Sequence, residues 1–207
     1  MTWSDDARHV LSTDTEAVLS LFPAAARHAR AEGRDGEEVR VELLAAVPGG
    51  VDDVVRVAST LYRRGDSAEK RAVIAGLPVL DRATPWRPAV GGALVPLLRD
   101  ALRTNDTRLV AAAMGEYAAA HLDDAAWRQG VVKAIFTGIP LAGVADLDRR
   151  TDDELRRMVR DFAAERRAAG REVPPDALAL LGAQPGTAAA DHTTPISTHP
   201  TSTGSSR

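Results

Sequence analysis

The sequence predicts an all-α protein of antiparallel helical pairs with a disordered C-terminal tail, and three observations point to this class. Aromatic residues make up only 4% of the 207 residues, so the core must consist mainly of Ala, Leu and Val, which favour close helix–helix contacts. Helix caps and apolar residues spaced three or four apart recur along the chain. No segment alternates with the period of two typical of β-strands. Eight or nine helices are expected, and their spacing favours a HEAT-like right-handed solenoid.

The first helices are marked by caps, a proline and a turn. Thr13 and Glu16 have the spacing of a capping box, in which each side chain bonds to the backbone of the other residue. Pro23 is expected to interrupt the helix that follows, because proline lacks an amide hydrogen. A short amphipathic helix is expected over residues 37–47, and the Pro-Gly-Gly sequence at 48–50 predicts a turn.

The next two helices show clearer boundaries. Residues 51–65 carry apolar residues on one helix face and end on a glycine in the position of a C-cap. Asp66 and Glu69 are expected to open the following helix, and Pro78 is expected to limit it. Another segment is expected to start at residues 84–85, where threonine suits the cap and proline the first turn.

Three helices and a short last one are expected in the second half, each with a cap at its start. They are residues 105–120 with Asn105 or Asp106 as the cap, 123–137 with Asp123 as the cap and Gly138 after its end, 151–170 with Thr151 and Glu154 as a capping box, and 174–182 opened by two prolines.

Residues 1–182 are therefore expected to form a single domain, and residues 183–207 a tail. The tail is dominated by Thr, Ser, Pro, Gly and His and contains almost no large apolar residues. Such a composition cannot bury enough surface to offset the entropy of ordering. His192 and His199 lie there, and we interpret them as part of the disordered segment rather than as metal ligands.

Charge and composition exclude several classes of protein. A net charge of −3 and a pI of about 6.0 give no basic excess for general nucleic-acid binding. Cysteine is absent, which fits a reducing compartment, and the first residues have no signal-peptide pattern. The apolar stretch 131–145 is broken by Lys133 and Pro140, so no membrane span is expected. A cytoplasmic location is expected.

The sequence contains no recognisable catalytic or cofactor-binding motif, and no cofactor or metal is expected. His121 with Asp123 and Asp124 forms a conceivable metal cluster, but a helix cap and a first-turn charge explain the two aspartates more simply. Asp161 and Glu165 share a helix face and could act as general acid and base. Neighbouring arginines favour a solvated ion-pair ladder instead.

The second half resembles a known family over residues 97–181. The resemblance rests on stretches in a fixed order: 103–105 (Arg-Thr-Asn), 122–127 (Leu-Asp-Asp-Ala-Ala-Trp), 132–138 (Val-Lys-Ala-Ile-Phe-Thr-Gly), 140–141 (Pro-Leu), 147–150 (Leu-Asp-Arg-Arg), 161–163 (Asp-Phe-Ala), 165–166 (Glu-Arg), 168–171 (Ala-Ala-Gly-Arg) and 173–175 (Val-Pro-Pro). This order resembles the EboA family. The chain departs from the family pattern at Arg128, Ala164 and Arg167, among other positions.

The resemblance implies a role in moving or preparing a secondary-metabolite precursor, prenylated or aromatic, toward the cell envelope. Partners implied in the same way are other proteins of the pathway, including a prenyltransferase-like membrane protein. Three functional classes follow: a non-catalytic component that binds a small molecule or a partner protein, which we favour, an enzyme acting on the metabolite, and a pure protein-binding scaffold.

Ten residues in the matched half are candidates for contacts with a ligand or partner: Arg103, Asn105, His121, Trp127, Lys133, Asp148, Arg149, Glu165, Arg166 and Arg171. Each also has a structural interpretation, such as a helix cap for Asn105 or the core for Trp127. In the functional interpretation, one polar groove gathers six of them, with arginines that would hold a carboxylate or phosphate: Lys133, Asp148, Arg149, Glu165, Arg166 and Arg171.

Overall fold

The computed structural model describes residues 2–84 and 88–182, and in these ranges the protein consists of helices without a β-strand. The α-helices are α1 (Trp3–Thr13), α2 (Val18–Ala31), α3 (Gly36–Ala45), α4 (Val51–Arg64), α5 (Ser67–Leu80), α6 (Val95–Arg103), α7 (Thr107–Ala113), α8 (Glu116–His121), α9 (Asp124–Thr137), α10 (Leu147–Arg150), α11 (Asp153–Ala168) and α12 (Pro175–Leu180). Three 3-10 helices join them: η1 (Thr15–Ala17), η2 (Gly91–Leu94) and η3 (Leu141–Gly143). The prediction of an all-α fold is confirmed. The tail predicted at 183–207, with its two histidines, lies outside the described residues, as does Pro85.

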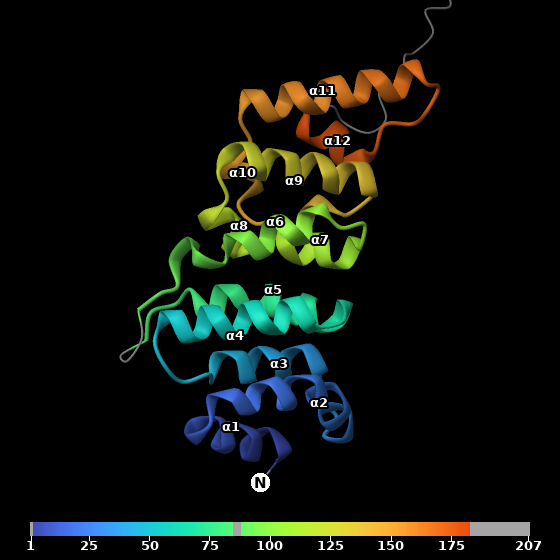
Figure 1. Cartoon of the computed structure of the whole chain (residues 1–207). Coiled ribbons are helices and arrows are strands. Elements are labelled where there is room, and N and C mark those ends of the chain that lie inside the picture. Colours follow the sequence, from blue (N-terminus) through green and yellow to red (C-terminus); the bar gives the residue numbers. More distant parts are fainter. Residues whose placement is uncertain (1, 85–87, 183–207) are drawn as a thin grey trace, which may run out of the picture.

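The helices stack in chain order into one elongated array, with α1 at one end and α11 at the other (Figure 1). One row consists of α3, α5, α7, α9 and α11, and each of these helices contacts the next. Beside it, α2 contacts α4, and η2 lies between α4 and α6. The HEAT-like solenoid and its handedness stay predictions.

Several caps lie where the sequence predicts them. Asp66 and Glu69 form the capping box of α5, with each side chain bonded to the backbone of the other residue. Asp106 caps α7, and Asp123 caps α9 by accepting from the amide of Ala126 at 2.8 Å. Gly138 follows α9 with a φ of 73°, a left-handed conformation that glycine adopts without strain.

The predicted capping box at Thr13 and Glu16 is wrong. Thr13 is the last residue of α1, and its hydroxyl donates to the carbonyl of Val10 at 3.0 Å. Asp14 caps η1 instead by accepting from the amide of Glu16. Aspartate is the stronger N-cap residue, so it takes the position beside the threonine.

Two prolines lie inside helices that they were expected to interrupt or end. Pro23 occupies the interior of α2 on its exposed side, where water can satisfy the carbonyl that loses an amide partner. Pro78 lies two residues before the end of α5, so few helical hydrogen bonds remain for it to disrupt.

The single helix expected over 105–120 is divided into α7 and α8. Gly115 is the N-cap of α8 in an extended conformation, with φ −77° and ψ −165°. The carbonyl of Met114 accepts from the amide of Ala145 at 3.0 Å. This long-range bond satisfies a backbone group that the break leaves free, and local sequence spacing cannot reveal it.

The predicted capping box at Thr151 and Glu154 is also wrong. Asp152 caps α11 by accepting from the amide of Leu155, whereas the Thr151 hydroxyl donates to the carbonyl of Leu147 at 2.6 Å. Here again the aspartate takes the cap from a neighbouring threonine.

Arg150 joins three helices in the second half. Its guanidinium donates to the carbonyls of Ala118, Ala119 and Leu122 at 3.2, 3.0 and 2.9 Å, at the C-terminal end of α8. It also pairs with Asp124 in the first turn of α9 at 2.7 Å and lies 4.8 Å from the ring centroid of Trp127. A cation at this position offsets the partial negative charge at the end of α8.

Apolar residues from all parts of the array form one connected core. Trp127 and Phe22 are among the largest side chains in it, each 1% exposed. In the described ranges, no helix is both long and apolar enough to cross a bilayer.

We expect Arg150→Ala to lower the free energy of unfolding by about 2–4 kcal/mol, because buried carbonyls then lose a charged donor. Arg149→Ala is the matched control, since Arg149 is exposed and pairs only with the nearby Asp146; its effect should stay within about 0.5 kcal/mol. Urea unfolding of both variants measures the difference. Equal effects would show that Arg150 does not hold these helices together.

Candidate functional site

A polar hollow of about 430 Å³ lies between α6 and the first half of α9. Arg99 and Asp123 form an ion pair at its edge, with 2.7 Å between Nη2 and Oδ2. The pKa of Asp123 is lowered, first by the amide of Ala126 and further by the charge of Arg99. The lining residues are Arg99, Leu102, Arg103, Asp123, Ala125, Ala126, Gln129, Gly130 and Lys133.

The Lys133 side chain caps the C-terminal end of α6. Its Nζ donates to the carbonyls of Leu102 and Thr104, both at 2.6 Å. These carbonyls lie where a helix leaves acceptors without intrahelical partners. Lys133 has no carboxylate partner among the described residues, so its charge is not neutralised locally.

An apolar hollow of about 410 Å³ continues along α9 toward its C-terminal end. Phe136 is 70% exposed there, and its ring meets that of Phe162 edge to face at 6.5 Å between centroids. The lining residues are Asn105, Gln129, Val132, Lys133, Phe136, Thr137 and Met158. Gln129 and Lys133 line both hollows, and we call the two together the joined hollow.

The structure brings three of the ten predicted candidates to the joined hollow. Arg103 lines its polar part, Asn105 its apolar part and Lys133 both. Trp127 is on α9 but 1% exposed, with its indole Nε1 buried and without a hydrogen-bond partner among the residues described. Trp127 therefore contributes to packing beneath Arg150 rather than to a surface that a ligand reaches.

The six residues expected in one polar groove contact different neighbours. Arg149 pairs with Asp146, whereas the Nε of Arg166 donates to the carbonyl of Glu172 at 2.6 Å. Lys133 bonds to the end of α6, as described above. These contacts give no support to a single groove, and a functional role for those residues outside the joined hollow stays a prediction.

The other three of these six residues are exposed. Asp148 lines a separate hollow of about 640 Å³ among η3, α10, α11 and α12. Glu165 and Arg171 have no side-chain partner in the part of the chain that the structure describes. On the same helix as Glu165, Asp161 pairs with Arg157 at 2.8 Å, so the two carboxylates do not share a proton site.

His121 belongs to a polar network that clamps the loop before α6. Its Nε2 lies 2.6 Å from Asp81 Oδ2, and its ring lies 4.6 Å from that of Tyr117. Asp81 also accepts from the amide of Gly91, while the Tyr117 hydroxyl donates to the carbonyl of Gly91 and accepts from the amide of Leu94. The network joins the end of α5, α8 and η2.

His121 does not join the aspartates considered with it as a metal cluster. Asp123 caps α9 and Asp124 pairs with Arg150. Within the described ranges, no group of three or more His, Asp or Glu residues is arranged to hold a metal ion.

Arg128, one of the departures from the family pattern, has a structural partner. Its Nε lies 3.0 Å from each carboxylate oxygen of Asp152, the cap of α11, and its Nη2 also contacts that carboxylate. The pair lowers the pKa of Asp152. Arg128 thus binds α9 to α11.

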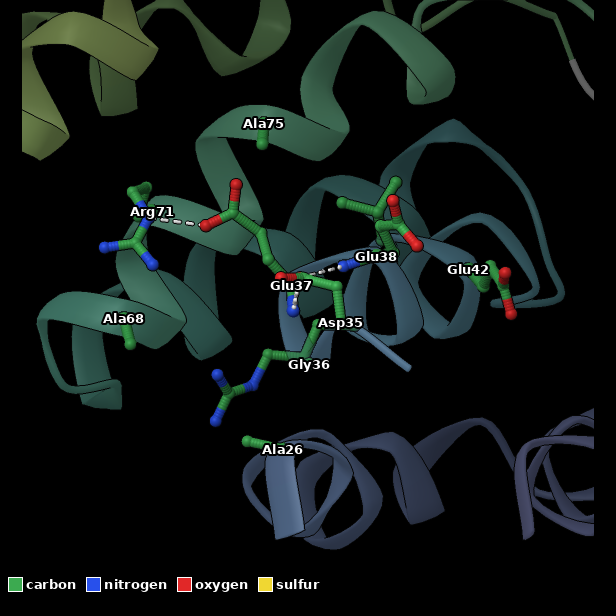
Figure 2. Close-up of a pocket in the computed structure, with 11 residues that line it drawn as sticks. Ala26, Asp35, Gly36, Glu37, Glu38, Glu42, Ala68, Arg71 and Ala75 are labelled. Carbon is green, nitrogen blue, oxygen red and sulfur yellow. Dashed lines mark hydrogen bonds and ion pairs between the residues drawn. The ribbon is translucent and has the colours of Figure 1, made fainter. Parts of the chain in front are cut away.

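Another hollow, of about 940 Å³, lies among α2, α3 and α5 and is lined by none of the ten candidates. Figure 2 shows Glu37 of α3 and Arg71 of α5 pointing toward one another there, and their ion pair measures 2.5 Å. Asp35 accepts from the amides of Glu37 and Glu38 at the start of α3. Glu37 thus joins α3 to α5, and Asp35 caps α3. Because both carboxylates are engaged, this hollow is a weaker candidate for ligand binding than the joined hollow.

Comparison with known protein families gives a match that includes the residues lining the joined hollow. A family model described as "Metabolite traffic protein EboA" matches residues 36–182, more than two thirds of the chain. The chain belongs to the EboA family. The EboA match starts at the first residue of α3 and extends further toward the N-terminus than the resemblance expected from residue 97. No curated protein and no solved structure gives a significant match.

Sequence reasoning missed Asp81, Arg99 and Phe136 as members of these sites. Asp81 and Arg99 are distant in sequence from their partners, and no local motif marks them. Phe136 did carry a signal, because it is a large apolar residue that lies outside the apolar helix face to which Ile135 belongs.

The raised pKa values of two tyrosines, Tyr62 on α4 and Tyr117 on α8, predict how the free energy of unfolding depends on pH. Burial raises the pKa of Tyr117 and, with Asp100 beside it, that of Tyr62. Tyrosine in the unfolded chain has a pKa of about 10. The contribution of the two tyrosines to the free energy of unfolding is therefore complete below that pH and is lost as the pH rises above it. Urea unfolding between about pH 9 and 11 should therefore show a shallower loss of stability in a Tyr62→Phe, Tyr117→Phe variant. Equal slopes would contradict this origin.

Proposed function

We propose that this EboA-family chain is a non-catalytic helical component of secondary-metabolite traffic or biosynthesis that binds a small molecule in the joined hollow. The observation that carries the proposal is the pairing of a charged and an apolar hollow on α9. Arg103, without a partner among the described residues, lines the charged hollow, and the exposed Phe136 lines the apolar one. Both hollows lie within the family match.

The chemistry of the joined hollow favours binding over catalysis. A general base must be free to accept a proton at the working pH. Asp123 is held ionised by the amide of Ala126 and the charge of Arg99, so it is a weak base. Lys133 donates to two carbonyls at the end of α6, so two of its N–H groups are already engaged. A carrier needs such groups only to attract and orient its cargo.

In this proposal the cargo is a prenylated or aromatic precursor, and the chain acts in the cytoplasm. It would exchange cargo with other proteins of the pathway, including a prenyltransferase-like membrane protein. The family description supports traffic of a metabolite, and the exposed Phe136 suits a cargo with an apolar part.

Native mass spectrometry of the full chain, purified from its own host, tests this proposal. The wild type is expected to carry a small-molecule adduct, and Ala125→Trp should abolish it by filling the polar hollow. Ala164→Trp is the matched control, because Ala164 is an exposed alanine on α11 that lines neither hollow. A bare wild type, or an adduct retained by Ala125→Trp, would contradict binding in the joined hollow. Co-purifying protein without an adduct would favour the adaptor role instead.

A further inference from the structure

Resting on the proposed function, we infer that the joined hollow selects an amphipathic anion. An acid group, such as a carboxylate or phosphate, lies at Arg103, and an apolar body lies against Phe136. The two hollows assign one chemical character to each part of the ligand.

The polar end is suited to an acid group. The charges of Arg99 and Asp123 compensate one another in their ion pair, whereas Arg103 and Lys133 have no carboxylate partner in the described part of the chain. Arg103 keeps its whole planar guanidinium free, a geometry that binds the two oxygens of an acid group.

The apolar end offers ring and methyl surfaces with few free polar groups. Phe136 and Val10 are the two large apolar side chains that stand out as exposed in the described ranges. Val132 and Met158 flank Phe136. The Thr137 hydroxyl donates to the carbonyl of Lys133 at 2.8 Å, so this polar group is already satisfied.

A single stripe on α9 connects the two hollows. Ala126, Gln129, Lys133 and Phe136 are three or four residues apart, so their side chains lie along one face of the helix. Lys133 lines both hollows and donates to the carbonyls of Leu102 and Thr104, on either side of Arg103. A ligand that fills both hollows therefore lies along this face of α9.

Two fluorescent probes with similar aromatic bodies test the inference. Anilinonaphthalene sulfonate carries an acid group, and N-phenylnaphthylamine does not. The wild type should bind the sulfonate about tenfold more tightly, because a hydrogen bond to a charged group is stronger than one between neutral groups. Arg103→Ala should remove most of this preference, whereas Phe136→Ser should weaken the binding of both probes.

Arg160→Ala is the matched control, since Arg160 is an exposed arginine of α11 that lines neither hollow. It should leave both affinities unchanged, and thermal unfolding of each variant should confirm that all of them fold. Equal affinity of the wild type for the two probes, or a preference retained by Arg103→Ala, would overturn the inference.

The native mass spectra separate this inference from the proposed function. A host adduct that Ala125→Trp abolishes, together with no preference for the sulfonate, would refute the acid group and leave small-molecule binding standing. A bare host protein that also binds neither probe would refute both.

Discussion

In the second half of the array, the position of α9 depends on the guanidinium of Arg150. It satisfies carbonyls at the end of α8, pairs with Asp124 at the start of α9 and lies over the ring of Trp127. An α-helix of only six residues is marginal by itself, so α8 relies on this cap. The Arg128–Asp152 pair then joins α9 to α11.

Once α9 is fixed, its two faces have different roles. Trp127, Val131, Ala134 and Ile135 are buried and connect α9 to the core. The other face presents Gln129, Lys133 and Phe136 to the joined hollow, together with the end of α6 and Met158 of α11. The buried face therefore holds these side chains in fixed positions relative to one another. A binding site on packed helices is positioned more exactly than one built on loops.

Much of the fold could be predicted from the sequence, because caps and apolar spacing are local signals. The caps at Asp66 and Asp123 and the glycine after α9 were correct for this reason. The caps predicted at Thr13 and Thr151 are wrong because the adjacent aspartate takes the cap position in each case. The break at Gly115 is accompanied by a hydrogen bond from Ala145, thirty residues away, which no local signal reveals.

The candidate site was less predictable than the fold. Arg103, Asn105 and Lys133 were identified from motif order, and the structure does place them at one joined hollow. The arginines of α10 and α11 have the same chemistry in the sequence, but their contacts lead elsewhere. Which arginine remains free is decided by its neighbours in space, since Arg150 and Arg128 are occupied by helix ends whereas Arg103 is not.

In our proposal, the face of α9 that lines the joined hollow binds the cargo. Amide hydrogen exchange of the full chain, with and without the low-molecular-mass fraction of a host extract, measures this binding. If the cargo binds there, exchange is slower within residues 99–105 and 123–137, which carry the joined hollow, and is unchanged in α1 to α4. Slower exchange confined to the hollow among α2, α3 and α5, or no change anywhere, would contradict the proposal.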